Sequence, residues 1–149
     1  MAAIMRKMNI ISRCESIYRT QQLEEELPGI FHSYLLAICR KPGMSQDKLA
    51  RHLCINKSNV TRHLAKLEQK GYIERKVSEE DKRELLVYPT QRMLDLHPEV
   101  VRITKEWNAL VSEDVTEEEL EVFHRVLDKM LDKSKAIVYG EEKPNENGI

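Results

Sequence analysis

Residues 56–76, NKSNVTRHLAKLEQKGYIERK, carry polar groups at a spacing that suits contact with a nucleic acid. At about 100° per residue, Val60, Leu64 and Leu67 point to one side of a helix. Hydroxyl, amide and guanidinium groups point to the opposite side, around the small Ala65, and no acid lies near the start. Such groups can contact base edges or phosphates in a major groove, and a helix N-terminus adds partial positive charge. The alternative is an ordinary amphipathic surface helix with a solvated basic face.

A short helix precedes this segment and a β-hairpin follows it. Ser45 suits the N-cap of the short helix, and Asn56 suits the N-cap of the helix in the quoted segment. Gly71 suits a left-handed residue at the end of that helix. The period then changes to that of strands, at 72–77 and 84–89, on either side of the polar tip SEEDKR. This order predicts a helix-turn-helix with a β-hairpin wing.

Four further helices are expected around this unit, which makes the fold mainly α with a small β-hairpin. The first follows apolar residues from Ile4 and is expected to stop at Pro28-Gly29, and the others are predicted at 30–40, 91–111 and 117–137. Thr116 and Glu119 form a capping box at the start of the last helix.

Charge is unevenly distributed along the 149 residues, although the net formal charge is only -1. Residues 48–83 hold ten Lys and Arg but five Asp and Glu, whereas residues 113–149 hold five and eleven. A basic middle suggests a segment that faces a polyanion. No apolar run approaches the ~18 residues of a membrane span, and no secretory signal is recognisable. Three cysteines without CxxC spacing are typical of reduced thiols, so we expect a cytoplasmic protein.

Residues 43–90, GMSQDKLARHLCINKSNVTRHLAKLEQKGYIERKVSEEDKRELLVYPT, resemble the DNA-binding core of the MarR family of bacterial winged helix-turn-helix transcription regulators. The resemblance lies in Leu49, Ala50 and Leu53 of the first helix, in VTRHLAKLEQKGYIER, and in Asp81-Lys82-Arg83 at the wing tip. One departure is Pro89-Thr90-Gln91, where that family commonly has an unbroken run into the next helix.

The resemblance implies a sequence-specific transcription regulator that binds double-stranded DNA, as a repressor released by a small-molecule effector. It also implies that Arg83 enters the minor groove while Asp81 holds it or a neighbouring base, since a narrow minor groove attracts arginine. The alternative is that Arg83 is a solvated turn residue. The residues expected to contact DNA are Ser45, Asn56, Ser58, Asn59, Thr61, Arg62, Lys66, Gln69, Arg75, Asp81, Lys82 and Arg83.

Apolar stripes near both chain ends exceed what one small domain can cover, and with the resemblance they predict a homodimer on a pseudo-palindromic site. Core packing within one subunit is the alternative for some of these residues. The stripes are Ile4, Met8 and Ile11, and then Leu120, Phe123, Leu127, Met130 and Leu131. We thus expect a single domain (1–149) with a winged core (30–90), dimerisation helices (1–27 and 91–137) and a flexible tail (138–149).

Other functions find less support in the residues. Phosphate loops and hydrolase or metalloprotease motifs are absent, and the five histidines are scattered, so no enzyme, cofactor or metal site is expected. The resemblance implies an effector pocket lined by Tyr34, Leu35, Tyr72 and Trp107. Some members sense peroxide through a cysteine in the first helix, but Cys14 lies on the apolar stripe and is expected in a core. A redox regulator switched at Cys14 and a winged-helix module for protein partners remain as alternatives.

Overall fold

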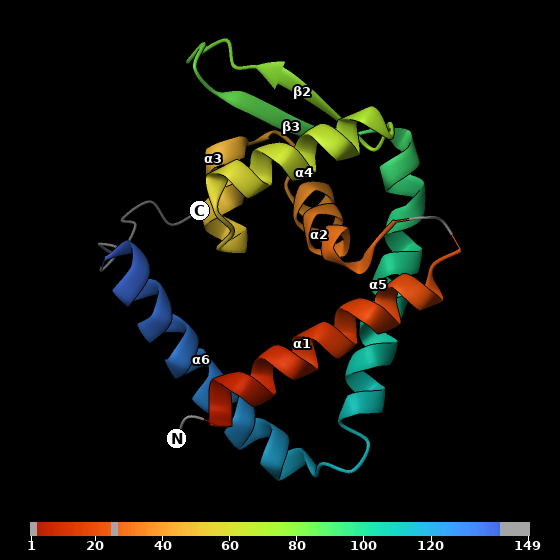
Figure 1. Ribbon diagram of the computed structural model, residues 1–149, viewed down its shortest axis with the longest axis vertical. Helices are drawn as coiled ribbons and strands as arrows, with labels where there is room; N and C mark the ends of the chain where they lie inside the picture. Colours follow the sequence, from red (N-terminus) through yellow and green to blue (C-terminus); the bar gives the residue numbers. More distant parts are fainter. Residues whose placement is uncertain (1–2, 25–26, 141–149) are drawn as a thin grey trace. The chain divides into compact units, whose positions relative to one another are not determined.

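The computed structural model describes residues 3–24 and 27–140, which divide into one unit up to Leu110 and a second from Val111 (Figure 1). The helices are α1 (Ala3–Gln22), the 3-10 turn η1 (Gly29–Phe31), α2 (His32–Arg40), α3 (Gln46–Leu53), α4 (Lys57–Gln69), α5 (Gln91–Val111) and α6 (Glu117–Tyr139). The strands are β1 (Met44–Ser45), β2 (Ile73–Val77) and β3 (Leu85–Pro89). The prediction of a mainly α winged helix-turn-helix fold is confirmed.

The ends of α3 and α4 are set by local hydrogen bonds that the sequence predicted. The Ser45 hydroxyl accepts from the Lys48 amide at 3.2 Å, and the Asn56 side chain accepts from the Ser58 amide at 2.9 Å. After α4, Gly71 has a φ of +80°, which lets the chain turn without a Cβ penalty. The Tyr72 amide then donates to a carbonyl in the last turn of α4.

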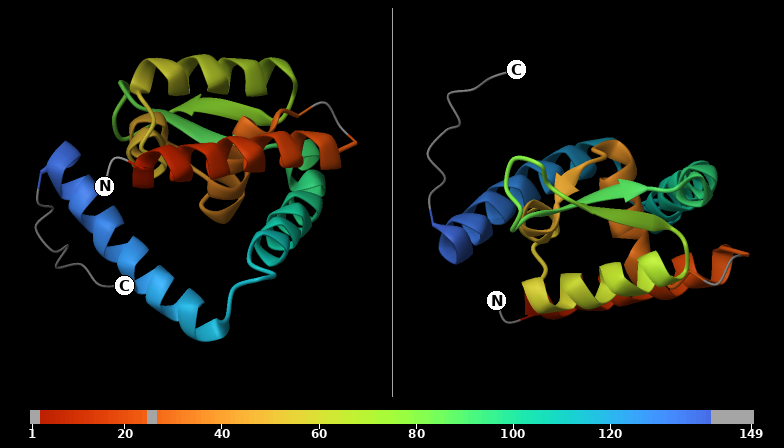
Figure 2. Two further views of the ribbon diagram at one scale, coloured as in Figure 1. Left: turned by 60° about the horizontal axis from the view of Figure 1, so that its bottom comes forward. Right: turned by 90° about the horizontal axis from the view of Figure 1, so that it is seen from above.

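The sheet has the order β1-β3-β2, with both pairs antiparallel. In the wing, Arg75 of β2 lies opposite Val87 of β3, and β2 runs alongside α4 in Figures 1 and 2. The strand β1 was not predicted, because two residues are too short to show an alternating pattern. It forms because Met44 and Ser45 pair with residues of β3.

Unit 1 has one apolar core, which sits beneath α4 and the sheet. Val60, Leu64 and Leu67 of α4 are each at most 1% exposed, so the predicted inner face of this helix is confirmed. Buried residues from α2, α3, both wing strands and α5 complete the same core. They include Tyr34, Leu35, Ile38, Leu49, Ala50, Ile73, Val87, Met93, Val100 and Ile103.

The connection between α1 and α2 differs from the prediction at both ends. The helix α1 ends at Gln22, before Pro28, because Leu23 and Leu27 leave the helix and are buried. Gly29 begins η1 where a Cβ would lie 2.4 Å from the Ser16 carbonyl oxygen, so only glycine permits this close approach to α1.

Unit 2 contains α6, whose predicted capping box is confirmed. The Thr116 hydroxyl accepts from the Glu119 amide at 3.2 Å, and the Glu119 carboxylate accepts from the Thr116 amide at 3.0 Å. The helix reaches Tyr139, two residues beyond the predicted end, and the rest of the expected tail, 141–149, lies outside the described residues.

The capping box gives a first prediction. Replacing Thr116 with alanine should lower the free energy of unfolding by about 1 kcal/mol, because the Glu119 amide loses its acceptor. Urea unfolding followed by circular dichroism measures this change. As the control, Glu119→Gln retains an acceptor for the Thr116 amide and should change stability by less; equal losses in both variants would contradict the capping role.

Within residues 3–24 and 27–140, no helix is both long enough and apolar enough to cross a membrane.

Candidate nucleic-acid interface

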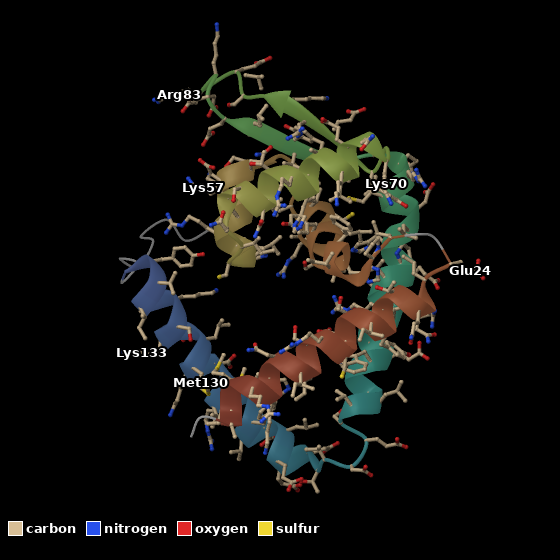
Figure 3. All side chains as sticks on the ribbon, in the orientation of Figure 1. Glu24, Lys57, Lys70, Arg83, Met130 and Lys133 are labelled. Carbon is tan, nitrogen blue, oxygen red and sulfur yellow. The ribbon has the colours of Figure 1, made fainter. Side chains whose placement is uncertain are left out.

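The outer face of α4 is exposed and carries the side chains that the sequence singled out. Ala65 is exposed at its centre, and no acidic residue occupies the first turn. The other exposed members of this face are Ser58, Thr61, Arg62, Lys66 and Gln69. In Figure 3 the helix runs from Lys57 to Lys70, and the wing tip with Arg83 lies toward the Lys57 end.

Hydrogen bonds within α4 hold several of these side chains in defined positions. The Ser58 hydroxyl donates to the Asn56 side-chain oxygen at 2.6 Å, and the same oxygen accepts from the Ser58 amide. The Arg62 guanidinium donates to the Asn59 side-chain oxygen. Because that contact uses one edge of the guanidinium, its remaining donors are directed rather than freely rotating.

Arg75, which the sequence predicted to contact DNA, is held by two other residues of the protein. Its guanidinium donates to Glu68 of α4 at 3.0 Å and to the side-chain oxygen of Gln46 in α3 at 3.1 Å. The Arg75 side chain is only 18% exposed, and the hydrogen bond from Arg75 is the main cause that lowers the pKa of Glu68. Arg75 therefore ties the wing strand to both helices of the helix-turn-helix.

Ser45, which the sequence also predicted to contact DNA, is buried. The residue is 3% exposed, and its hydroxyl caps α3 by accepting from the Lys48 amide, so it is not presented to a partner at the surface. Gln46, beside it, was missed by the sequence reasoning although its amide donates to Thr61 on the outer face of α4 at 3.2 Å. A polar residue in the first turn of a helix has no periodic signal that would reveal such a contact.

The wing tip has the arrangement that the sequence predicted for Asp81 and Arg83. The Asp81 carboxylate accepts from the Arg83 amide at 3.0 Å and from the Arg83 Nε at 3.3 Å. The Arg83 side chain is 91% exposed, so Asp81 holds the base of a guanidinium that otherwise projects into solvent. Figure 3 shows Arg83 at the tip of the hairpin, where Lys82 is also exposed.

The inner side of α4 carries a polar contact to the core. The Tyr34 hydroxyl lies 2.8 Å from Nδ1 of His63, and burial raises the pKa of Tyr34 to about 12. Burial also lowers the pKa of His63, and Arg62 and Lys66 lower it further. Both effects favour the neutral imidazole, which suits its position between the core and the basic outer face.

Three of the four residues expected to line an effector pocket are buried in the core. Tyr34, Leu35 and Tyr72 are at most 1% exposed and belong to the core, while Trp107 packs on Tyr18 with ring centroids 5.3 Å apart. A hydrophobic pattern identifies buried positions equally well whether they face a cavity or a packed core, so the effector pocket at these residues stays a prediction.

Cys14 is exposed in this chain, which corrects the expectation that it lies in a core. None of the residues of α1 is buried within the described chain. Tyr18, one turn away, is engaged with Trp107, and burial followed by the Glu106 carboxylate raises the pKa of Tyr18. Among the described residues, no group of His, Cys, Asp and Glu side chains is arranged to hold a metal ion.

Comparisons with known proteins agree with this geometry. The MarR family profile matches residues 32–85. The HTH-type transcriptional regulator YybA of Bacillus subtilis is 26% identical over 128 residues, which cover 85% of each chain. The HTH-type transcriptional regulator BilQ of Clostridium symbiosum is 30% identical over 97 residues, 65% of this chain and 67% of BilQ. A putative MarR family regulator from Listeria monocytogenes, solved with a 26mer DNA, is 26% identical with a TM-score of 0.82, covering 95% of this chain and 98% of that one.

The two capped helices, the acid-free outer face of α4 and the β-hairpin beside it define a winged helix-turn-helix protein. The chain belongs to the MarR family and is a transcriptional regulator.

Proposed function

We propose that this regulator binds double-stranded DNA sequence-specifically, as a homodimer on a pseudo-palindromic site, and represses transcription. The observation that carries the proposal is the outer face of α4, which is exposed, free of acids in its first turn, and flanked by the exposed Arg83 of the wing. A helix of this kind fits a major groove while a wing arginine fits the adjacent minor groove. The Listeria relative was solved with a 26mer DNA, which supports DNA binding by this chain.

Exposed apolar side chains on α1 and α6 support the homodimer. Each helix presents its own apolar side chains to solvent, and none of the residues of either helix is buried. A two-fold axis between two copies would cover these faces and repeat the recognition helix on successive turns of the duplex. The exposed apolar residues include Ile4, Met5, Ile10, Ile11 and Ile17 of α1, and Val122, Phe123, Val126 and Leu131 of α6.

A small-molecule effector that releases the DNA is part of the proposal, as is a cytoplasmic location without catalytic activity. An open pocket of about 470 Å³ between Leu23 and Glu24, which follow α1, and the start of α5 supports an effector site, because its volume suits a small ligand. Its lining residues are Leu23, Glu24, Arg92, Asp95, Leu96 and Glu99. The second candidate is a redox switch at Cys14, whose thiol is exposed in the single chain.

Selection of bound duplexes from a random pool, run with and without peroxide, tests these functions. A recurring inverted repeat supports the proposal, and loss of binding in peroxide that Cys14→Ser abolishes supports the redox switch. Failure of the folded protein to enrich any duplex contradicts DNA binding and favours a winged-helix module for protein partners.

Binding to the selected duplex should weaken steeply with salt. The Lys and Arg side chains of α4 and the wing displace counterions from phosphates, and each phosphate contact adds about −0.9 to the slope of log K against log salt. Fluorescence anisotropy between low and moderate salt measures the slope. An affinity that stays constant over this range would contradict the proposed electrostatic contact.

A further inference from the structure

The Thr61 hydroxyl, on the outer face of α4, is engaged by the protein itself. It donates to the Lys57 carbonyl at 3.0 Å, one turn earlier in the helix. It also accepts from the Gln46 side-chain nitrogen at 3.2 Å, from the neighbouring helix α3. A hydroxyl has one donor and two acceptor positions, so the donor and one acceptor position are used.

The orientation of the Gln46 amide follows from its other partner, Arg75. An arginine side chain has donors only, so the atom of Gln46 that faces its guanidinium at 3.1 Å must be the oxygen. The nitrogen of the same amide must then face Thr61, where it can only donate. Glu68 holds the other side of the guanidinium at 3.0 Å, which keeps the whole chain of hydrogen bonds in this direction.

The consequence is that Thr61 has no hydroxyl proton left for a base. What it retains for a partner is its methyl group and a single lone pair. In a major groove the natural apolar counterpart of a threonine methyl group is the C5-methyl group of thymine. Ser58 lies on the same face, and its hydroxyl group donates to the Asn56 side chain. It has no methyl group with which to make such a contact.

We propose that Thr61 selects thymine through its methyl group, and that Gln46 and Arg75 are positioning residues that hold it in place. This inference rests on the proposed DNA binding and adds a base preference and two residues to it. Arg75 acts through Gln46 without touching the DNA, which accounts for its burial in a segment otherwise rich in exposed basic residues.

Replacing single thymines of the selected duplex with deoxyuridine tests the proposal, because this exchange removes only the C5-methyl group. With the wild-type chain, one thymine position in each half-site should lose about fourfold in affinity when it becomes deoxyuridine, as expected for one buried methyl group. Fluorescence anisotropy at fixed salt gives the ratio of the two affinities. The Thr61→Ser variant, which keeps the hydroxyl group and its two hydrogen bonds but lacks the methyl group, should bring this ratio close to one.

The ratio of the affinities for the thymine and deoxyuridine duplexes also tests the positioning residues, because a general loss of stability does not change it. Gln46→Ala and Arg75→Lys should each lower the thymine-to-deoxyuridine ratio, with thermal melting confirming that the variants are folded. Gln69→Ala, on the same face but outside this chain of hydrogen bonds, serves as the control and should keep the ratio even if total affinity falls.

Two results would overturn the inference while leaving DNA binding intact: a wild-type chain insensitive to every deoxyuridine, or a ratio that Thr61→Ser leaves near fourfold. The latter would mean that the Thr61 methyl group does not contact the thymine. If no duplex is enriched by the wild-type chain, the proposed function itself fails, so the two failures are distinguishable.

Discussion

The Arg62→Ala variant is expected to bind the selected duplex about 1–3 kcal/mol more weakly and to lose base preference at one position of each half-site. Arg62 lies on the exposed face of α4, and its bond to Asn59 orients the guanidinium before DNA arrives. An arginine held in this way can donate two parallel hydrogen bonds to guanine, which no other base accepts in the same geometry. Affinities for duplexes with each base at every position, measured at fixed salt, give the preference directly.

Lys66→Ala provides the matched control, because Lys66 is exposed near the edge of the same face. A lysine that contacts phosphate should weaken all duplexes by a similar factor and reduce the salt slope by about one. If Arg62→Ala also weakens every duplex equally, Arg62 is a phosphate contact and its assignment as a base-reading residue is wrong.

The Asp81→Ala variant is expected to bind the specific duplex more weakly, although the change removes a negative charge from a surface that approaches phosphate. The Asp81 carboxylate accepts from both the amide and the Nε of Arg83, and without it the exposed guanidinium is free to rotate. Arg83→Ala should lose about 1.5–3 kcal/mol, the range for a hydrogen bond to a charged group. Fluorescence anisotropy at fixed salt measures both losses.

Two comparisons separate the positioning role of Asp81 from simple electrostatics. Glu79→Ala removes an acid from the same tip and should bind as tightly as the wild type or more tightly, because Glu79 is exposed beside the tip. The double variant of Asp81 and Arg83 should lose less than the sum of the two single losses, since both act through one contact. Tighter binding by Asp81→Ala, or strictly additive losses, would show that Asp81 does not position Arg83.

Much of the winged helix-turn-helix could be predicted from the sequence because its signals are short-range. The caps at Ser45 and Asn56 join residues two or three positions apart, and the inner face of α4 follows from the helical period alone. The contact between Asp81 and Arg83 spans two residues, so a hairpin tip of this composition makes it wherever the rest of the chain lies.

What the sequence could not determine are the contacts between residues distant in the chain. In the sequence, Arg75 cannot be distinguished from the other basic residues near the recognition helix. Only the packing of β2 on α4 brings it to Gln46, 29 positions earlier. The pair of Tyr34 and His63 has the same separation and depends on how α2 packs beneath α4.

Where the sequence pattern was ambiguous, tertiary packing determined whether a side chain is buried. Ser45 reads as a polar surface residue, yet pairing of β1 with β3 buries it at the start of α3. Cys14 lies on an apolar stripe, yet it is exposed, because no residue of α1 is buried within this chain. An apolar stripe specifies only that a face can be buried, and the packing partners supplied by tertiary structure decide whether it is.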